Sequence, residues 1–204
     1  MTTPPDEATL IELSRQGDLQ AFNQLVLAYQ DQVYGLCLRM LGAQQPAEDV
    51  TQEAFISAYR NVRRMRGPSV KSWLLRIASN ACIDELRRRQ RRPQISIDYR
   101  RDSDETETSF DVPDSTPGPE QLALRQELRS ALQLELLELP PDQRLAIVLC
   151  DIEGLAYEEV AEAMGTSVGT VKSRISRGRA RLREAIESKP ELFGGLIRHT
   201  RETD

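Results

Sequence analysis

The chain has 204 residues and a formal net charge of −5, with 39% hydrophobic and 29% charged residues. This length and composition fit one or two globular domains with small cores, and no apolar run approaches the ~18 residues that a membrane span needs. The amino-terminal residues lack the basic start and apolar core of a signal peptide. We therefore expect a cytoplasmic protein with no membrane insertion.

The net charge alone argues against a nucleic-acid partner, but the distribution of charge along the chain reverses that inference. Residues 60–101 hold thirteen Lys and Arg and only three acidic residues, a local charge of +10. Residues 102–120 hold seven acidic residues and no base. The total charge therefore hides a strongly cationic segment that could contact an anionic partner.

Residues that usually carry catalysis or hold metals are scarce. Cys37, Cys82 and Cys150 are far apart with no CxxC pair, and His199 is the only histidine. This pattern argues against a disulfide framework or a zinc site and predicts buried free thiols. We also find no Gly-rich phosphate loop and no paired carboxylates in an apolar setting. We therefore expect a protein that is not an enzyme and uses no metal or cofactor.

The N-terminal part of the chain is predicted to be helical. Residues 7–15 predict a short helix, and apolar residues then recur with a helical period over residues 21–41. Gly42 fits the end of that helix. The next helix is predicted over residues 46–61, because proline is favoured at a first helical position and acidic residues suit a first turn.

The helix over residues 46–61 has two different faces. The inward face is predicted to be apolar and consists of Val50, Ala54, Phe55, Ala58 and Tyr59. The opposite face carries Asp49, Gln52 and Glu53. From the pattern alone, a solvated acidic face without a partner is the commoner interpretation.

A basic loop over residues 60–68 leads into a long helix predicted over residues 70–91, with Ser69 as its cap. Trp73 fits a core position on this helix better than a base-stacking one. Five arginines lie within residues 87–92. One or two cations at the end of a helix can be explained by their interaction with the helix dipole, but five are more than that explanation needs. Contact with a phosphate backbone is therefore the better interpretation of this cluster.

The middle of the chain changes character. Residues 93–119 are rich in proline and acidic residues and poor in apolar ones, which predicts a flexible linker. Helical periodicity resumes at residue 120, and Pro140-Pro141 interrupts it before a further helix predicted over residues 143–152. Residues 189–204 form a C-terminal tail in which we expect a helix break near the start.

Two helices joined by a tight turn are predicted over residues 155–183. The first covers about residues 156–164, and Gly165 fits a left-handed position after it. Ser167 is placed to cap the second helix, which starts near Val168. This helix, turn and helix arrangement is typical of proteins that place their second helix in the DNA major groove.

One side of the second helix is apolar, and the rest of its surface is polar and cationic. At about 100° per residue, one side consists of Val168, Val171, Ile175, Leu182 and Ile186. The other side carries Lys172, Ser173, Ser176, Arg177 and Ala180. Residues 166–183 contain six basic residues and no acid. A solvated basic helix on an ordinary bundle is the alternative, but the turn spacing and the absence of acids favour DNA binding.

Three motifs in this order resemble one family. The sequence AEDVTQEAF at residues 47–55 looks like the signature helix of region 2 in extracytoplasmic-function (ECF) sigma factors, the alternative promoter-recognition subunits of bacterial RNA polymerase. Residues 71–88 resemble that family's −10-reading segment. Leu139-Pro140-Pro141 and residues 154–183 resemble its region 4. Together the resemblance covers roughly residues 10–92 and 120–185.

The resemblance implies roles for particular residues. The surface that docks on the polymerase clamp helices would be Asp49, Gln52, Glu53 and Phe55. The −10 DNA contacts would be Asn80, Asp84, Arg87 and Arg88, with the loop over residues 60–69. The −35 DNA contacts would be Lys172, Ser173, Arg174, Ser176 and Arg177. The chain departs from the family pattern at Val70, where Phe is common, and at Ala156, where a capping Ser is common.

The resemblance further implies an all-α fold with two small helical domains on a flexible acidic linker. The expected divisions are region 2 over residues 1–92, the linker over 93–119, region 4 over 120–188 and a tail over 189–204. The implied partners are core RNA polymerase, through its clamp helices and flap, promoter DNA and an anti-sigma factor. The alternative is a stand-alone helix-turn-helix regulator whose N-terminal half is a sensor or dimerisation domain.

Overall fold

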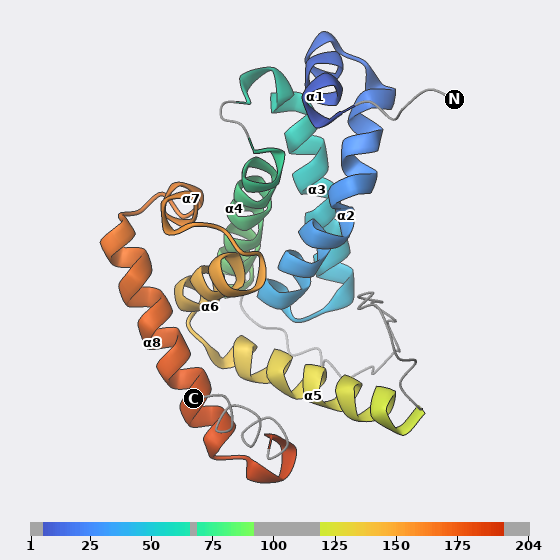
Figure 1. Cartoon of the computed structure of the whole chain (residues 1–204). Helices are drawn as coiled ribbons and strands as arrows, with labels where there is room; N and C mark the ends of the chain where they lie inside the picture. The colour runs from blue at the N-terminus through green and yellow to red at the C-terminus, as the bar shows by residue number, and fades with distance from the viewer. Residues whose placement is uncertain (1–5, 66–68, 92–118, 194–204) are drawn as a thin grey trace.

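A computed structural model describes residues 6–65, 69–91 and 119–193, and every secondary-structure element in this part of the chain is a helix (Figure 1). The all-α prediction is therefore confirmed, whereas most of the predicted linker lies outside the described residues. The helices are α1 (Glu7–Gln16), α2 (Leu19–Leu41), α3 (Gln44–Asn61), α4 (Val70–Arg91), α5 (Pro119–Glu138), α6 (Pro141–Ile147), α7 (Tyr157–Ala163) and α8 (Val168–Glu187). A 3₁₀ turn, η1 (Val62–Arg64), and a π-helical turn, η2 (Val148–Ile152), complete them.

The helix ends follow the local turn chemistry of the sequence. The Asp18 carboxylate accepts hydrogen bonds from the backbone N–H groups of Gln20 and Ala21 and so caps α2. At the other end, Gly42 has a φ of 73°, a left-handed conformation that costs glycine little, and it ends α2 as predicted. One boundary differs, because α3 begins at Gln44, two residues before Pro46.

The N-terminal half is a bundle in which α2, α3 and α4 contact one another and α1 covers α2. On α4, the fully packed residues are Val70, Leu74, Leu75, Ala78 and Cys82. Trp73, which we expected at a core position, is only partly buried against that core, as are Ile77, Ala81 and Leu86. The prediction that Tyr59 is buried is wrong: its side chain is 37% exposed, and its ring centroid lies 5.0 Å from that of Phe22 in a tilted pair.

The C-terminal half packs α6 against α8, with α7 in contact with both α8 and α4. The helix predicted over residues 143–152 begins at Pro141 and changes to π-helical hydrogen bonding at Val148. The predicted helix break is present, because α8 ends at Glu187 and residues 188–189 are not helical. A short helical turn follows over residues 190–193, the Lys189 ammonium pairs with the Glu135 carboxylate on α5, and Phe193 is completely buried.

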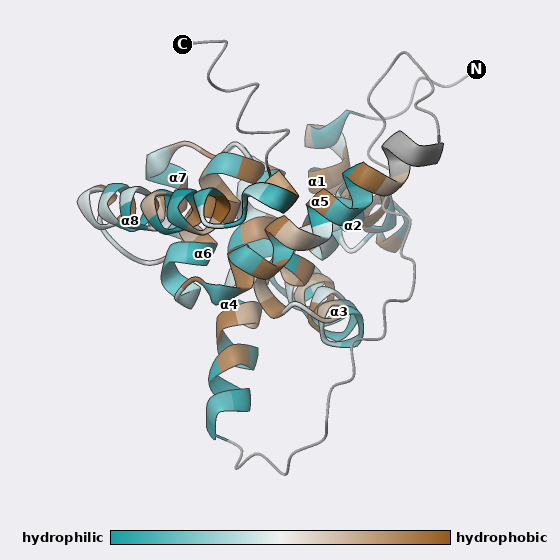
Figure 2. Ribbon diagram, turned by 90° about the horizontal axis from the view of Figure 1, so that it is seen from below, coloured by the Kyte–Doolittle hydropathy of each residue, from teal (hydrophilic) through white to brown (hydrophobic). Residues whose placement is uncertain are grey.

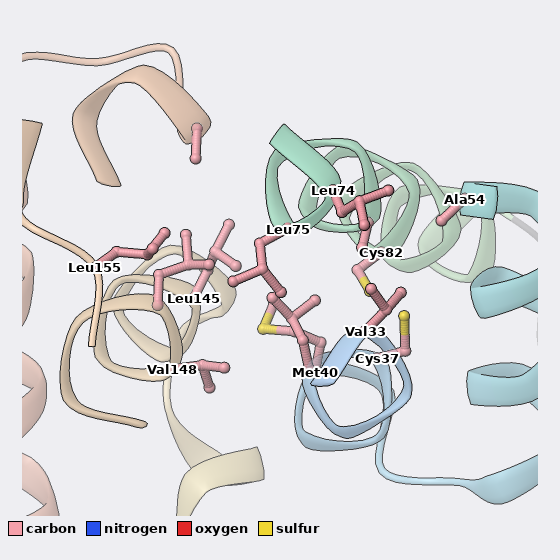
Figure 3. Close-up of a cluster of buried hydrophobic side chains, with 14 of the residues drawn as sticks. Val33, Cys37, Met40, Ala54, Leu74, Leu75, Cys82, Leu145, Val148 and Leu155 are labelled. Atoms are coloured by element: carbon pink, nitrogen blue, oxygen red, sulfur yellow. The ribbon is translucent and has the colours of Figure 1, made fainter. Parts of the chain in front are cut away.

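The two halves share one hydrophobic core. Leu75 and Met40 from the first half lie against Leu145 and Val148 from the second (Figure 3). Figure 2 shows the same arrangement from below, with hydrophobic residues towards the middle and hydrophilic ones on the outer sides of α8 and at the free end of α4. The sequence predicted two helical units but not their direct packing.

The C-terminal end of α2 receives polar side chains from the second half. The Arg144 guanidinium donates to the backbone oxygens of Met40 and Leu137, and to that of Leu139 at 3.0 Å. The Gln133 amide lies 3.3 Å from the Leu38 oxygen. The last carbonyls of a helix have no partner within the helix and carry partial negative charge, so a cation and an amide donor are well suited there.

Gly178 permits the close approach of α8 to α6. A Cβ at this position would lie 2.5 Å from Ile147 Cδ1, whereas a Cβ at Gly169 would meet only the Ser167 hydroxyl, at 3.8 Å. Alanine is favoured over glycine in a helix by up to about 1 kcal/mol, but overpacking a core costs about 1–3 kcal/mol. We predict that Gly178→Ala is less stable to urea unfolding than Gly169→Ala by roughly 1–2 kcal/mol.

The steric cause can be tested separately with Ile147→Val, because valine lacks the Cδ1 atom. The cost of Gly178→Ala should be smaller in the Ile147→Val background than in the original chain. An equal cost in both backgrounds would contradict the steric explanation.

Candidate functional site

The turn between α7 and α8 is built from side chains and backbone in the predicted way. Gly165 has a φ of 59°, and the Ser167 hydroxyl accepts from the Thr170 N–H at 3.2 Å at the start of α8. Ala156 has no capping group of its own. Instead, the Glu159 carboxylate accepts from the Ala156 N–H at 2.9 Å, so this glutamate, which sequence reasoning missed, supplies the cap for α7.

The orientation predicted for α8 is confirmed. Val171 and Ile175 are buried, and Gly178 is buried beside them. Lys172, Ser176 and Arg177 are exposed on the rest of the helix. The stripe therefore fixes α8 to α6 and leaves a polar, cationic face available to a partner.

The cationic side chains of α8 are not all equivalent. The Lys172 ammonium lies 5.7 Å from the ring centroid of Tyr157 on α7, and the Arg177 guanidinium lies 3.0 Å from the Ser173 hydroxyl. The Arg174 guanidinium pairs with the Asp142 carboxylate of α6 at 2.9 Å. Arg174 therefore helps to hold α8 on α6, and the structure does not group it with the outward-facing residues.

A second polar cluster lies along the last three turns of α4, which project from the bundle (Figure 2). Asn80 and Asp84 are both exposed and one turn apart. Asp84, Arg87, Arg88 and Arg91 line an open depression of about 400 Å³. Arg91 was not among the predicted contacts. Arg87 lies 3.4 Å from Asp84, and Arg88 pairs closely with Glu85, but both arginine side chains are more than 60% exposed and so can be reached by an anionic ligand.

Residues 60–69 are only partly described, since residues 66–68 lie outside the described ranges. The described residues at the start of this loop are hydrogen-bonded to α1. The Arg63 guanidinium donates to the Arg15 backbone oxygen at 2.9 Å, and the Arg15 guanidinium donates to the Met65 oxygen at 2.9 Å. This pair of contacts fixes the start of the loop beside α1.

The acidic face of α3 forms the third cluster. Asp49, Gln52 and Glu53 line an open depression of about 520 Å³ together with Ile56, Ser57, Arg60 and Asn61. Ile56 is 45% exposed, so a large apolar side chain lies among the acidic ones. Phe55 does not line the depression and is partly buried against the core. The structure thus groups three of the four predicted residues and adds Ile56, which the sequence reasoning did not select.

The described residues contain no group of three or more His, Cys, Asp or Glu side chains placed to hold a metal ion. Within the same residues, no helix has both the length and the apolarity required to cross a bilayer. The surfaces that stand out are the cationic face of α8, the α4 cluster and the acidic depression on α3.

Comparison with known proteins gives a consistent picture. Residues 25–92 match the family described as Sigma-70 region 2, and residues 129–182 match Sigma-70, region 4. The chain is 40% identical over 185 residues to the ECF RNA polymerase sigma factor SigE of Mycolicibacterium smegmatis, covering 90% of this chain and 68% of the relative. It is 39% identical over 188 residues to the RNA polymerase sigma-H factor of Pseudomonas aeruginosa, covering 92% and 97%.

Among solved structures, the fold resembles the sigma factor RpoE of Bartonella quintana, which was crystallised with the anti-sigma factor NepR. The TM-score is 0.63 at 27% identity, and the match covers 83% of this chain and 98% of that one. The similarity extends through both helical halves of the chain.

Proposed function

The chain belongs to the ECF RNA polymerase sigma factors of the sigma-70 family, and we propose that it binds core polymerase, a −10 element and a −35 element through three separate surfaces. As a member of this family it is a non-catalytic subunit that initiates transcription. The observation that carries the assignment of surfaces is the presence of two exposed cationic helix faces, on α4 and α8, in one chain.

The face of α8 is assigned to duplex DNA at the −35 element. The helix is held by Val171, Ile175 and Gly178, so the side chains on its outer side can enter a major groove without disturbing the core. The Arg177 guanidinium has the bidentate geometry that reads guanine, and the Ser173 and Ser176 hydroxyls can reach phosphate or base edges. Arg174 has a supporting role in this proposal because it is paired with Asp142.

The α4 cluster is assigned to the −10 element in its opened form. An unpaired base exposes its hydrogen-bonding edge, which the amide of Asn80 or the carboxylate of Asp84 can read. The neighbouring Arg87, Arg88 and Arg91 can hold the phosphates of the same strand. The exposure of these groups at the projecting end of α4 supports this assignment.

The depression on α3 is assigned to core polymerase, with the clamp helices as its partner. Its acidic side chains can pair with basic side chains, and the exposed Ile56 offers an apolar contact beside them. The polymerase flap is assigned to the C-terminal half. Phe55 stabilises the position of α3 from beneath in this proposal and does not touch the partner.

An anti-sigma factor is the proposed regulator. The fold similarity to RpoE of Bartonella quintana, which is known in complex with NepR, supports this proposal. The alternative, a stand-alone regulator, would need a sensor site in the N-terminal half. The depressions that we describe there are open and polar, which suits macromolecular contacts better than an enclosed small ligand.

Run-off transcription tests the proposed function directly. Purified core polymerase, the chain and a genomic fragment from upstream of the chain's own gene should yield a defined transcript that requires both proteins. Omission of either protein is the control. Binding of the chain alone to the duplex, with no effect on initiation by the core, would favour the stand-alone regulator.

We predict that Arg177→Ala weakens recognition of the −35 element by about 1–3 kcal/mol, the usual range for one base contact. The loss should largely disappear on a promoter whose −35 element is already altered. Arg183→Ala removes the same charge further along the exposed surface of α8 and is the matched control. The Arg183→Ala variant should bind the intact promoter and the promoter with the altered −35 element more weakly by the same factor. Equal loss on both promoters for Arg177→Ala would rule out base reading by this residue.

We predict that Glu53→Lys reduces binding to core polymerase, because it places a cation in the acidic rim of the α3 depression. Pull-down of the purified core is the measurement. Glu48→Lys makes the same charge change at an exposed position of α3 that does not line the depression. An unchanged yield for Glu53→Lys, or an equal loss for both variants, would remove this assignment.

A further inference from the structure

Glu85 lies among the arginines at the end of α4, but its environment differs from that of its neighbour Asp84. The Glu85 side chain is 12% exposed, whereas that of Asp84 is 75% exposed. Successive residues of a helix are turned by about 100°, and Glu85 lies beside the open depression on α4 without lining it. The proposed −10 contacts do not account for a largely enclosed carboxylate inside a cationic cluster.

Two arginine side chains donate to the Glu85 carboxylate, one to each oxygen. Arg88 Nε lies 2.6 Å from Oε2, and Arg88 Nη2 lies 2.5 Å from the same oxygen. Arg89 Nε lies 2.9 Å from Oε1. Burial raises the pKa of Glu85, but the hydrogen bonds and charges of Arg89 and Arg88 outweigh burial and hold the pKa below its usual value. The carboxylate is therefore ionised at neutral pH.

The two arginines have different surroundings. Arg88 is 64% exposed and lines the depression on α4. Arg89 is 38% exposed and does not line the depression. It follows the buried Cys82 by seven residues and so lies on the same side of the helix. Glu85 therefore connects an arginine on the core side of α4 to an arginine on its outer side.

This connection fixes the orientation of the outer arginine. An arginine on a helix surface has several rotatable bonds and loses that freedom when it binds a phosphate. Glu85 holds Arg88 by Nε and Nη2, which lie on one side of the planar guanidinium. The Nη1 donors lie on the other side and make no hydrogen bond to the described residues. A phosphate in the depression can therefore meet a guanidinium whose orientation is already set.

The charge of Glu85 has the opposite effect, because a carboxylate repels a phosphate. Each of its oxygens contacts a guanidinium, and little of the side chain is open to a ligand. The repulsion also acts over a longer distance than the contact between Arg88 and a phosphate, and water screens it on the exposed side of the helix. We therefore expect the orienting effect to exceed the repulsion.

We propose that Glu85 is a positioning residue for the −10 strand: anchored by Arg89, it aims Arg88 at a phosphate of the single strand. This inference rests on the proposed function of the α4 cluster. Glu85 itself does not touch DNA. Phosphate contacts carry no sequence information, so Glu85 sets how tightly the strand is held and leaves the reading of bases to Asn80 and Asp84.

The test is a double-mutant cycle on Glu85 and Arg88 in the full-length chain. Fluorescence anisotropy measures binding to a fluorescein-labelled single-stranded oligonucleotide at low ionic strength, where phosphate contacts are strongest. Glu85→Gln should weaken binding by roughly threefold to tenfold, because Arg88 loses its fixed orientation. In an Arg88→Ala background, Glu85→Gln should no longer weaken binding.

Gln90→Lys is the matched control, since it makes the same change of charge at an exposed position of α4. It should strengthen binding in both backgrounds. The salt dependence supplies a readout that a mere loss of helix stability would not change. Glu85→Gln should make the slope of log K against log salt shallower by about 0.7, the value for one phosphate contact on a single strand. Circular dichroism establishes that each variant retains its helices.

Stronger binding by Glu85→Gln, with a steeper salt dependence, would show that the carboxylate acts by repulsion and would overturn the proposal. So would a loss that persists in the Arg88→Ala background, or the absence of measurable binding by the original chain. The outcome is independent of the run-off experiment. The expected cycle in a chain that starts no transcript would contradict the proposed function alone. Transcripts together with unchanged strand binding by Glu85→Gln would contradict this inference alone.

Discussion

The C-terminal end of α2 is the point on which the arrangement of the whole chain depends. A helix leaves its last carbonyl oxygens without partners, and here those of Leu38 and Met40 accept from Gln133 and Arg144 of the other half. Gly42, left-handed at the helix end, allows Leu137 to pack directly on the backbone there. One helix end thus positions α5 and α6, and through them the helix-turn-helix, relative to α4.

This docking joins the two helical halves while leaving the outer face of α8 exposed. The helix-turn-helix can present its cationic face without rearranging its own core, because α8 is held by residues of its own half. The two halves meet at a shared apolar cluster and at several desolvated polar groups, among them the Arg144 guanidinium.

Local structure could be predicted from the sequence because its causes are local. Capping by Ser167, the left-handed Gly165 and the apolar stripe of α8 each follow from a few neighbouring residues, and all three are confirmed. The packing of the halves could not be predicted this way, since it depends on contacts between residues about 100 positions apart, such as Arg144 with Met40. For the same reason, the resemblance placed Arg174 among the −35 contacts, although the structure pairs it with Asp142.

The central claim is that two helical halves of one chain occupy two separate elements of the same promoter. The most direct measurement is a hydroxyl-radical footprint of promoter DNA with core polymerase and the chain together. The account predicts two protected patches on the same molecule, centred roughly 25 base pairs apart, about two and a half helical turns. A single continuous patch of about one helical turn would contradict it.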